Sequence, residues 1–130
     1  MADIFISYAK ADQAAASDVH QQLVADDVSV FMADRSIEPG ADWKSRIERE
    51  IQAAGLVLVL ASRAGCQSAW VQNEVGMAVA VRRKIIPVIW DMPASDLPGV
   101  LSGYQALDLV NRTPEQVQVA FEEIRKGIHL

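Results

Sequence analysis

The sequence has few of the residues that build disulfides or metal sites. Its 130 residues include one cysteine, Cys66, which excludes an intrachain disulfide framework and favours a reducing compartment. The two histidines, His20 and His129, are isolated, and Cys66 has no spaced companion. Because structural and catalytic metals need several such ligands at short spacings, we expect no metal site.

Positive charge is also in short supply. Lys and Arg number 12 against 17 Asp and Glu, which gives a formal net charge of −5 at pH 7. Surfaces that bind nucleic acid or anionic membranes are usually basic, so we expect neither kind of partner.

Long apolar runs and a leader-like opening are missing as well. The longest apolar stretches, such as residues 56–62, are far shorter than the ~20 residues that cross a bilayer. Met1 leads straight into a strand-like segment, which predicts that no secretory signal is present. We therefore expect a soluble cytoplasmic protein.

What the chain does contain is enough apolar residues for one compact domain. Hydrophobic residues make up 51% of the sequence, and its length suits a single domain over residues 1–130. Apolar and β-branched runs predict strands at 3–7, 28–32, 56–61, 84–90 and, more weakly, 106–109. Helices are expected from Asp12, from Asp42, over about 68–83 and from Thr113. At the last of these, Thr113 and Gln116 have the spacing of a capping box. This alternation predicts a parallel sheet with helices on both faces.

Pro87 conflicts with this pattern. It lies inside the fourth expected strand, where a proline has no N–H to donate to a neighbouring strand. We expect it on an edge strand, or at a position where its nitrogen side is unpaired. The following segment, 91–103, is expected to be a loop with at most a short helix.

The stretch from Ser68 to Glu74 is the most informative in the chain. Ser68 is placed to cap a helix, and Trp70 and Glu74 then lie one turn apart on the same helix face. That face is otherwise apolar, and burying an unpaired carboxylate costs several kcal/mol. Glu74 is therefore either paired with another residue or directed into a cleft.

The expected topology favours the cleft. Ligands of open parallel sheets bind outside the carboxyl ends of the strands. These ends carry Ser7 and Tyr8 after the first strand, and Asp34 and Arg35 after the second. The helix that begins at Ser68 emerges at the same rim.

Taken together, these motifs resemble a TIR (Toll/interleukin-1 receptor) domain over essentially the whole chain. The resemblance rests on residues 4–8, the second strand ending at 31–34, the loop from Arg35 to Trp43, and residues 68–74. It implies a single flavodoxin-like α/β domain with a five-stranded parallel sheet of order 2-1-3-4-5. A phosphoacceptor receiver shares this fold, but Ser7 and Tyr8 stand where its acidic cluster would be.

The resemblance also implies an activity. Many TIR domains cleave NAD+ at the nicotinamide–ribose bond, using a glutamate in the helix after the third strand and a tryptophan one turn earlier. Glu74 and Trp70 occupy these places, so Glu74 is expected to be catalytic. The residues expected to bind substrate are Ser7, Tyr8, Lys10, Asp34, Arg35, Trp43, Ser68 and Trp70. NAD+ is then a substrate, and no cofactor is expected.

Two positions depart from well-known members of the family. Several enzymatic animal members have an arginine where this chain has Ala9, so Lys10 or Arg35 is expected to contact the phosphates instead. Receptor members often carry Phe-Trp near the last helix, where this chain has Ala120 and Phe121. The second difference favours the bacterial, NAD-cleaving branch, with a role in immune or antiphage signalling.

The chemistry requires only one carboxylate. Loss of nicotinamide leaves positive charge on the ribose, which a nearby carboxylate stabilises. Capture of that cation by water gives ADP-ribose, and capture by another part of the same molecule gives a cyclic isomer. Enzymatic members often self-associate, here through the loop from Arg35 to Trp43. The alternative is a non-enzymatic module that assembles with other TIR domains, including a bacterial effector that interferes with host signalling.

Overall fold

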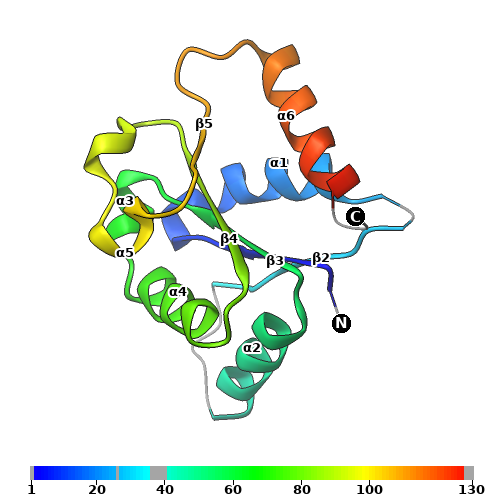
Figure 1. The fold of residues 1–130 in the computed structure, drawn as a ribbon. Coiled ribbons are helices and arrows are strands. Elements are labelled where there is room, and N and C mark those ends of the chain that lie inside the picture. Colours follow the sequence, from blue (N-terminus) through cyan, green and yellow to red (C-terminus); the bar gives the residue numbers. More distant parts are fainter. Residues whose placement is uncertain (1, 26, 36–40, 128–130) are drawn as a thin grey trace.

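A five-stranded parallel sheet forms the centre of the molecule (Figure 1). The structure is a computed structural model that describes residues 2–25, 27–35 and 41–127, Ala41 by its backbone alone. The strands are β1 (Ile4–Ser7), β2 (Val30–Met32), β3 (Leu56–Leu60), β4 (Lys84–Ile89) and β5 (Leu107–Asp108). Their order is β2-β1-β3-β4-β5, which confirms the flavodoxin-like expectation.

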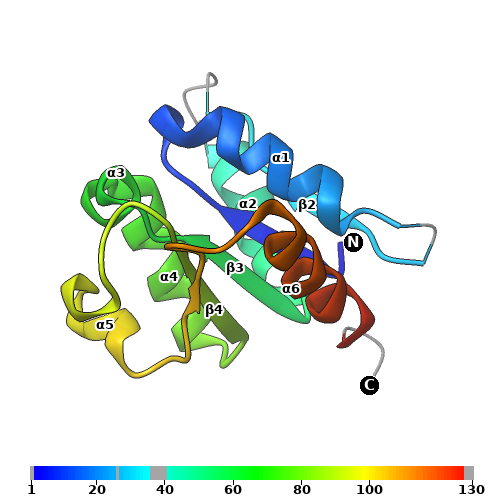
Figure 2. The same cartoon turned by 90° about the horizontal axis from the view of Figure 1, so that it is seen from above.

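Helices cover both faces of this sheet, as expected. They are α1 (Gln13–Leu23), α2 (Ala41–Ala53), α3 (Arg63–Gln67), α4 (Ala69–Ala80), α5 (Gly99–Ser102) and α6 (Pro114–Gly127), with 3-10 turns η1 (Lys10–Asp12) and η2 (Ala94–Asp96). α1 and α6 lie on one face, whereas α2, α4 and α5 lie on the other (Figures 1 and 2). Across the described ranges, none of the helices has the length and hydropathy needed to span a bilayer.

The alternation of side chains along β1 separates two cores. Ile4 and Ile6 pack with α1 and α6, whereas Phe5 packs with α2 and α4. Because the strand period is two residues, Ser7 follows Phe5 toward the α4 side. β3 is buried along its whole length, as a central strand of a covered parallel sheet should be.

Pro87 lies within an inner strand rather than at the edge of the sheet. β4 pairs with β3 along its whole length apart from Ile89, and Val59 is the partner of Pro87. On its other side β4 pairs with β5 at Val88 and Ile89. Up to Pro87, therefore, β4 has a recorded strand partner on one side, and there the missing N–H is tolerated.

Several element boundaries differ from the predictions. Asp12 precedes α1 but does not cap it, because its carboxylate accepts a hydrogen bond from Ser62. Asp42 lies in the first turn of α2 rather than at its N-cap. The short helix α3 was not expected, since five residues are too few to show a helical period. The capping box of α6 is confirmed: Thr113 and Gln116 exchange hydrogen bonds of 2.9 and 3.2 Å.

Candidate active site

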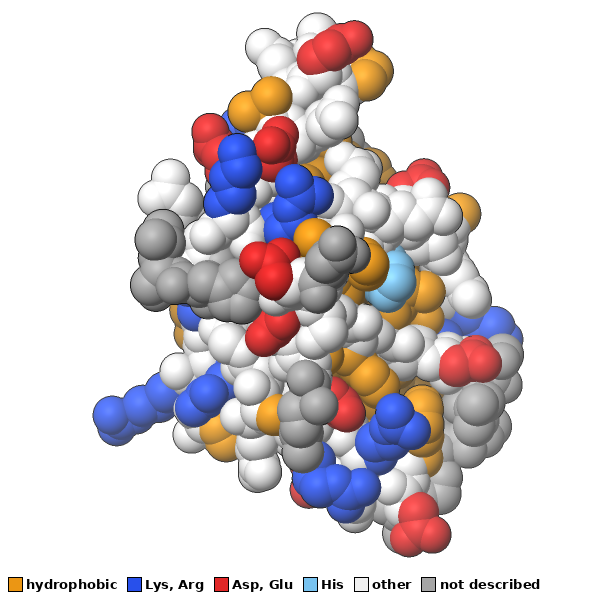
Figure 3. Space-filling view, turned by 90° about the vertical axis from the view of Figure 1, so that its right-hand side faces the viewer, with side chains coloured by type: hydrophobic (Ala, Val, Ile, Leu, Met, Phe, Trp, Pro, Cys, Tyr) orange, Lys and Arg blue, Asp and Glu red, His pale blue; other side chains and the backbone are white. Residues whose placement is uncertain are grey.

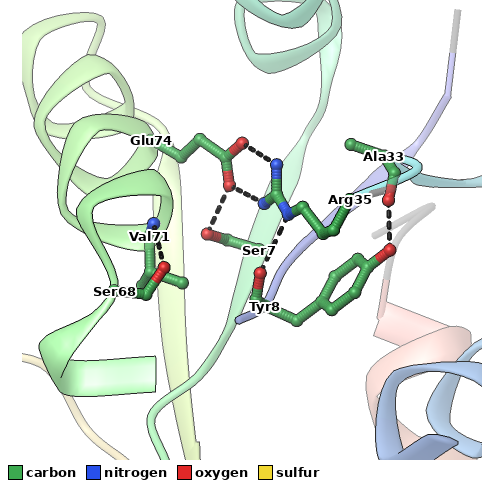
Figure 4. A network of polar contacts seen from close by, with 7 residues as sticks. All are labelled: Ser7, Tyr8, Ala33, Arg35, Ser68, Val71 and Glu74. Carbon is green, nitrogen blue, oxygen red and sulfur yellow. Dashed lines mark hydrogen bonds and ion pairs between the residues drawn. The ribbon is translucent and has the colours of Figure 1, made fainter. Parts of the chain in front are cut away.

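Three polar side chains from three different elements meet at the carboxyl rim of the sheet. Ser7 ends β1, Arg35 follows β2, and Glu74 lies in the second turn of α4 (Figure 4). Parallel strands bring the first two to one edge, and α4 begins at that edge after β3. The sequence therefore predicted the neighbourhood of these residues, although it did not predict that they contact one another.

Glu74 is almost completely buried, with 1% of its surface exposed. Its Oε2 accepts a hydrogen bond from Arg35 Nη1 at 2.8 Å, and its Oε1 accepts a second from Arg35 Nη2. Ser7 Oγ donates to the same Oε1 at 2.7 Å. Of the two alternatives that the sequence left open for Glu74, the structure shows the paired one. Both oxygens of the carboxylate are engaged.

Arg35 is held on its faces as well as at its tip. Its Cζ lies 4.9 Å from the centre of the Tyr8 ring and 5.4 Å from that of Trp70. Its Nε donates to the Tyr8 carbonyl at 2.9 Å. Trp70 and Glu74 thus contact the same guanidinium, as their positions one helical turn apart predict. Arg35 is 5% exposed, so the site is closed to solvent.

Tyr8 links the ends of the first two strands. Its hydroxyl donates to the carbonyl of Ala33, and its ring is fully buried on the α1 side of the sheet. Burial raises the pKa of the Tyr8 phenol, while the nearby Arg35 partly opposes that rise. The phenol therefore stays neutral and keeps the proton that it donates to Ala33.

The other predicted substrate-binding residues have different surroundings. Ser68 caps α4, because its Oγ accepts a hydrogen bond from the Val71 amide at 3.3 Å (Figure 4). Trp43 packs against the core between the sheet and α2, with the guanidinium of Arg46 5.7 Å from its ring centre. Lys10 and Asp34 are exposed at the rim. Residues 36–40 of the loop expected to mediate self-association lie outside the described residues.

A second polar cluster at this rim was not singled out from the sequence. Ser62 donates to Asp12 and accepts from the Gly65 amide at 2.9 Å, which joins the start of α3 to η1. The Arg63 amide donates to Asp91 at 3.1 Å. Serine and aspartate directly after strands were the available signal, but they are equally typical of helix caps.

Two open grooves of the described surface lie away from this rim. One, of about 1250 Å³, runs along α6 and the starts of β3 and β4, where Leu56, Lys84 and Glu123 are among its lining residues. A smaller one lies between α1 and α6. Neither is lined by a predicted site residue. On the face shown in Figure 3, acidic and basic side chains are interspersed, without a broad area of one sign.

No metal-binding group is found in the described part of the chain, where no three His, Cys, Asp or Glu residues gather. Cys66 is half-buried on α3, and burial together with the charge of Asp91 raises the pKa of its thiol. A neutral thiol of this kind is a poor nucleophile. Glu74 is therefore the candidate for chemistry at this rim.

Comparison with known proteins identifies the fold family. The family model described as TIR domain matches residues 4–124. The chain is 27% identical over 97 residues to a protein of Brachypodium distachyon named as a probable 2' cyclic ADP-D-ribose synthase. The match covers 73% of this chain but only 43% of that relative, so the chain spans less than half of its length.

Solved structures show the same fold at low sequence identity. The TIR domain of a Toll-related receptor from Hydra magnipapillata superposes with a TM-score of 0.72 at 17% identity, covering the whole of both chains. A TIR-STING receptor from C. gigas gives 0.75 at 23% identity, over 98% of this chain and 39% of its own. The TIR domains of the activated Roq1 resistosome give 0.77 at 16% identity, over 98% and 99%.

Proposed function

This chain belongs to the TIR domain family, and from that premise we propose that it cleaves NAD+ at the nicotinamide–ribose bond. Glu74 is the catalytic carboxylate in this proposal. The observation that carries it is a buried, ionic glutamate at the ligand-binding rim of a parallel sheet, facing a cation beside an aromatic ring.

The reaction proceeds by departure of nicotinamide from the anomeric carbon of the ribose. The leaving group departs as a neutral base, because its ring nitrogen already carries positive charge, so no general acid is needed. Positive charge then develops on the ribose, as in other glycosidic cleavages. The Glu74 carboxylate stabilises that charge at short range in a site from which water is excluded.

Ser7 and Trp70 have supporting roles in this scheme. The Ser7 hydroxyl donates to Glu74 and fixes Oε1, while Oε2, which accepts from Arg35 in this structure, faces the ribose once the guanidinium has left. The Trp70 ring stacks on a flat ring of the substrate and excludes water. In this proposal the exposed Lys10 and Asp34 contact the rest of the dinucleotide, and Arg35 does so only after its guanidinium has left Glu74.

The product is ADP-ribose or a cyclic isomer of it. The Brachypodium relative, by its name, forms a cyclic ADP-ribose, and this supports an enzyme of the same general class. Because the chain spans less than half of that relative, its product and its role in immune or antiphage signalling remain part of the proposal.

Chromatography of a reaction with NAD+ tests the assignment. Purified protein, assayed at several concentrations, is expected to release nicotinamide, and Glu74→Gln is expected to abolish that release. Glu48→Gln, an equivalent change on the exposed side of α2, is the control and should retain it. Equal release by Glu74→Gln and the native protein would show that another residue performs the reaction.

A second function is favoured by the pairing of Glu74. A carboxylate that is fully engaged by Arg35 and Ser7 also serves as an anchor in a non-enzymatic module. Such a module assembles with other TIR domains, as an adaptor or as an effector that interferes with host signalling. It predicts concentration-dependent assembly without consumption of NAD+.

A further inference from the structure

We propose that Arg35 is an internal occupant of a site for flat cations, and that its guanidinium holds the place of the substrate's positive charge. This inference rests on the proposed function for the identity of the natural ligand. The site itself has the Glu74 carboxylate at its bottom and the rings of Tyr8 and Trp70 as its walls.

The carboxylate has no free face while Arg35 is present. Two of its hydrogen bonds come from the guanidinium and one comes from Ser7. The side chains of Arg35 and Glu74 are each only 2% exposed. A ligand that uses Glu74 must therefore displace the guanidinium, because Arg35 already donates to both carboxylate oxygens.

The walls of the site suit a planar cation. The guanidinium carbon lies within 6 Å of both aromatic centres, which is the range of cation–π attraction. A flat, delocalised cation gains from both rings and from the carboxylate together. A compact ammonium group would match the charge but not the shape.

The substrate carries a cation of this kind. The nicotinamide ring of NAD+ is planar and positively charged, and the charge moves to the ribose as the bond breaks. A buried carboxylate without a counter-charge is strongly disfavoured, so in the absence of substrate the protein supplies its own. Ligand and Arg35 then compete for one place. The apparent Kd for substrate equals the intrinsic Kd divided by the fraction of molecules in which Arg35 has left the site.

Arg35 is able to leave without disrupting the carboxylate's other support. Its backbone follows β2, whereas Glu74 and Ser7 belong to α4 and β1 and keep their own hydrogen bond. Its other side-chain contacts with described residues are a hydrogen bond to the Tyr8 carbonyl and the faces of the Tyr8 and Trp70 rings. Rotation of one side chain therefore separates the closed state from one that accepts a ligand.

Refilling the site with a small cation tests this directly. In Arg35→Ala, ethylguanidinium at millimolar concentration is expected to bind and to raise Tm by several degrees, measured by differential scanning fluorimetry. Ethylammonium should have a much smaller effect. The native protein, whose site is full, should show no such rise. Ethylguanidinium should also inhibit NAD+ cleavage by the variant, with NAD+ as competitor.

Arg46→Ala is the matched control. Arg46 also lies over two aromatic rings, those of Phe31 and Trp43, but it is exposed on α2. Its replacement should create no binding of ethylguanidinium. If Arg35→Ala does not fold even with the cation present, Arg35→Gln takes its place. This neutral occupant should be displaced more readily and should lower KM for NAD+ by about threefold or more.

Two results would overturn the inference. One is a folded Arg35→Ala protein that does not bind ethylguanidinium. The other is an inactive Arg35→Ala or Arg35→Gln protein to which ethylguanidinium restores activity, since Arg35 would then be a required positioning residue. Failure of the proposed function looks different: ethylguanidinium still stabilises Arg35→Ala, but neither protein releases nicotinamide.

Discussion

At the level of single residues, the ion pair between Arg35 and Glu74 combines a cost of desolvation with a gain from the contact between the charges. Removing two charges from water costs several kcal/mol per ion, and the bidentate contact offsets that cost only while both partners are present. The pair therefore contributes less to folding than the loss of either member would suggest. Its value is the placement of a negative charge where water is excluded.

A double-mutant cycle measures this asymmetry. Arg35→Met alone should lower the free energy of unfolding by about 3–5 kcal/mol, because it leaves the Glu74 carboxylate buried without a partner. Combining it with Glu74→Leu should recover most of that loss, since both charges are then gone. Urea denaturation of the two single variants and the double variant gives the comparison. Additive losses would show that the two side chains do not depend on each other.

The Tyr8 hydroxyl supplies a pH-dependent part of the stability. The pKa of the buried phenol is raised above its ordinary value near 10, so the folded protein holds this proton more tightly than the unfolded chain. Its contribution is complete below pH 10 and is lost as the pH rises through the folded pKa. Tyr8→Phe should cost about 1–2 kcal/mol at pH 7.5, since the Ala33 carbonyl loses its donor.

Unfolding of the native protein and Tyr8→Phe at pH 7.5 and 10.5 checks that prediction. The difference in stability between them should shrink at the higher pH. Tyr104→Phe, which removes the hydroxyl of a half-buried tyrosine elsewhere, is the control. A difference that stays constant between the two pH values would contradict the proposed role of the phenol proton.

At the scale of elements, α3 depends on the absence of a side chain at Gly65. A Cβ built there would lie 2.1 Å from the carbonyl oxygen of Leu60, so the helix approaches the end of β3 as closely as backbone allows. Gly65→Ala should cost about 1–3 kcal/mol through this overlap. Gly76→Ala should instead stabilise by about 0.5–1 kcal/mol, because Gly76 lies exposed in α4 with open space around it. Thermal unfolding of both variants tests the opposite signs, and a neutral Gly65→Ala would mean that α3 is free to move.

The helices and strands also show which features of the fold can be predicted from the sequence alone. Local signals were sufficient for the five strands, for the cap at Ser68 and for the exchange between Thr113 and Gln116, because each involves neighbours in the chain. The partner of Glu74 was not predictable in this way. Arg35 lies 39 positions earlier, and its choice of Glu74 over the solvent depends on how β1, β2 and α4 converge. Helix α3 was missed because its five residues are too few to show a helical period.

At the scale of the whole molecule, the site is enclosed, whereas two grooves elsewhere on the described surface are open. The site is built from β1, the end of β2 and α4, and its residues line neither of these two grooves. In an isolated molecule of this form, Arg35 therefore blocks access of NAD+ to the Glu74 carboxylate. Contacts between molecules are a route by which the balance between closed and open forms would shift, because any partner that binds the open form favours it.

Mixing active and inactive molecules tests whether such contacts matter. Native protein at a concentration where its activity is low is combined with an excess of Glu74→Gln, which retains the shape of the side chain but not its charge. If assembly opens the site, the inactive molecules should join the assembly and raise nicotinamide release per native molecule several-fold. If each molecule acts alone, the rate should stay at that of the native protein by itself. Light scattering of the same mixtures measures assembly independently of turnover.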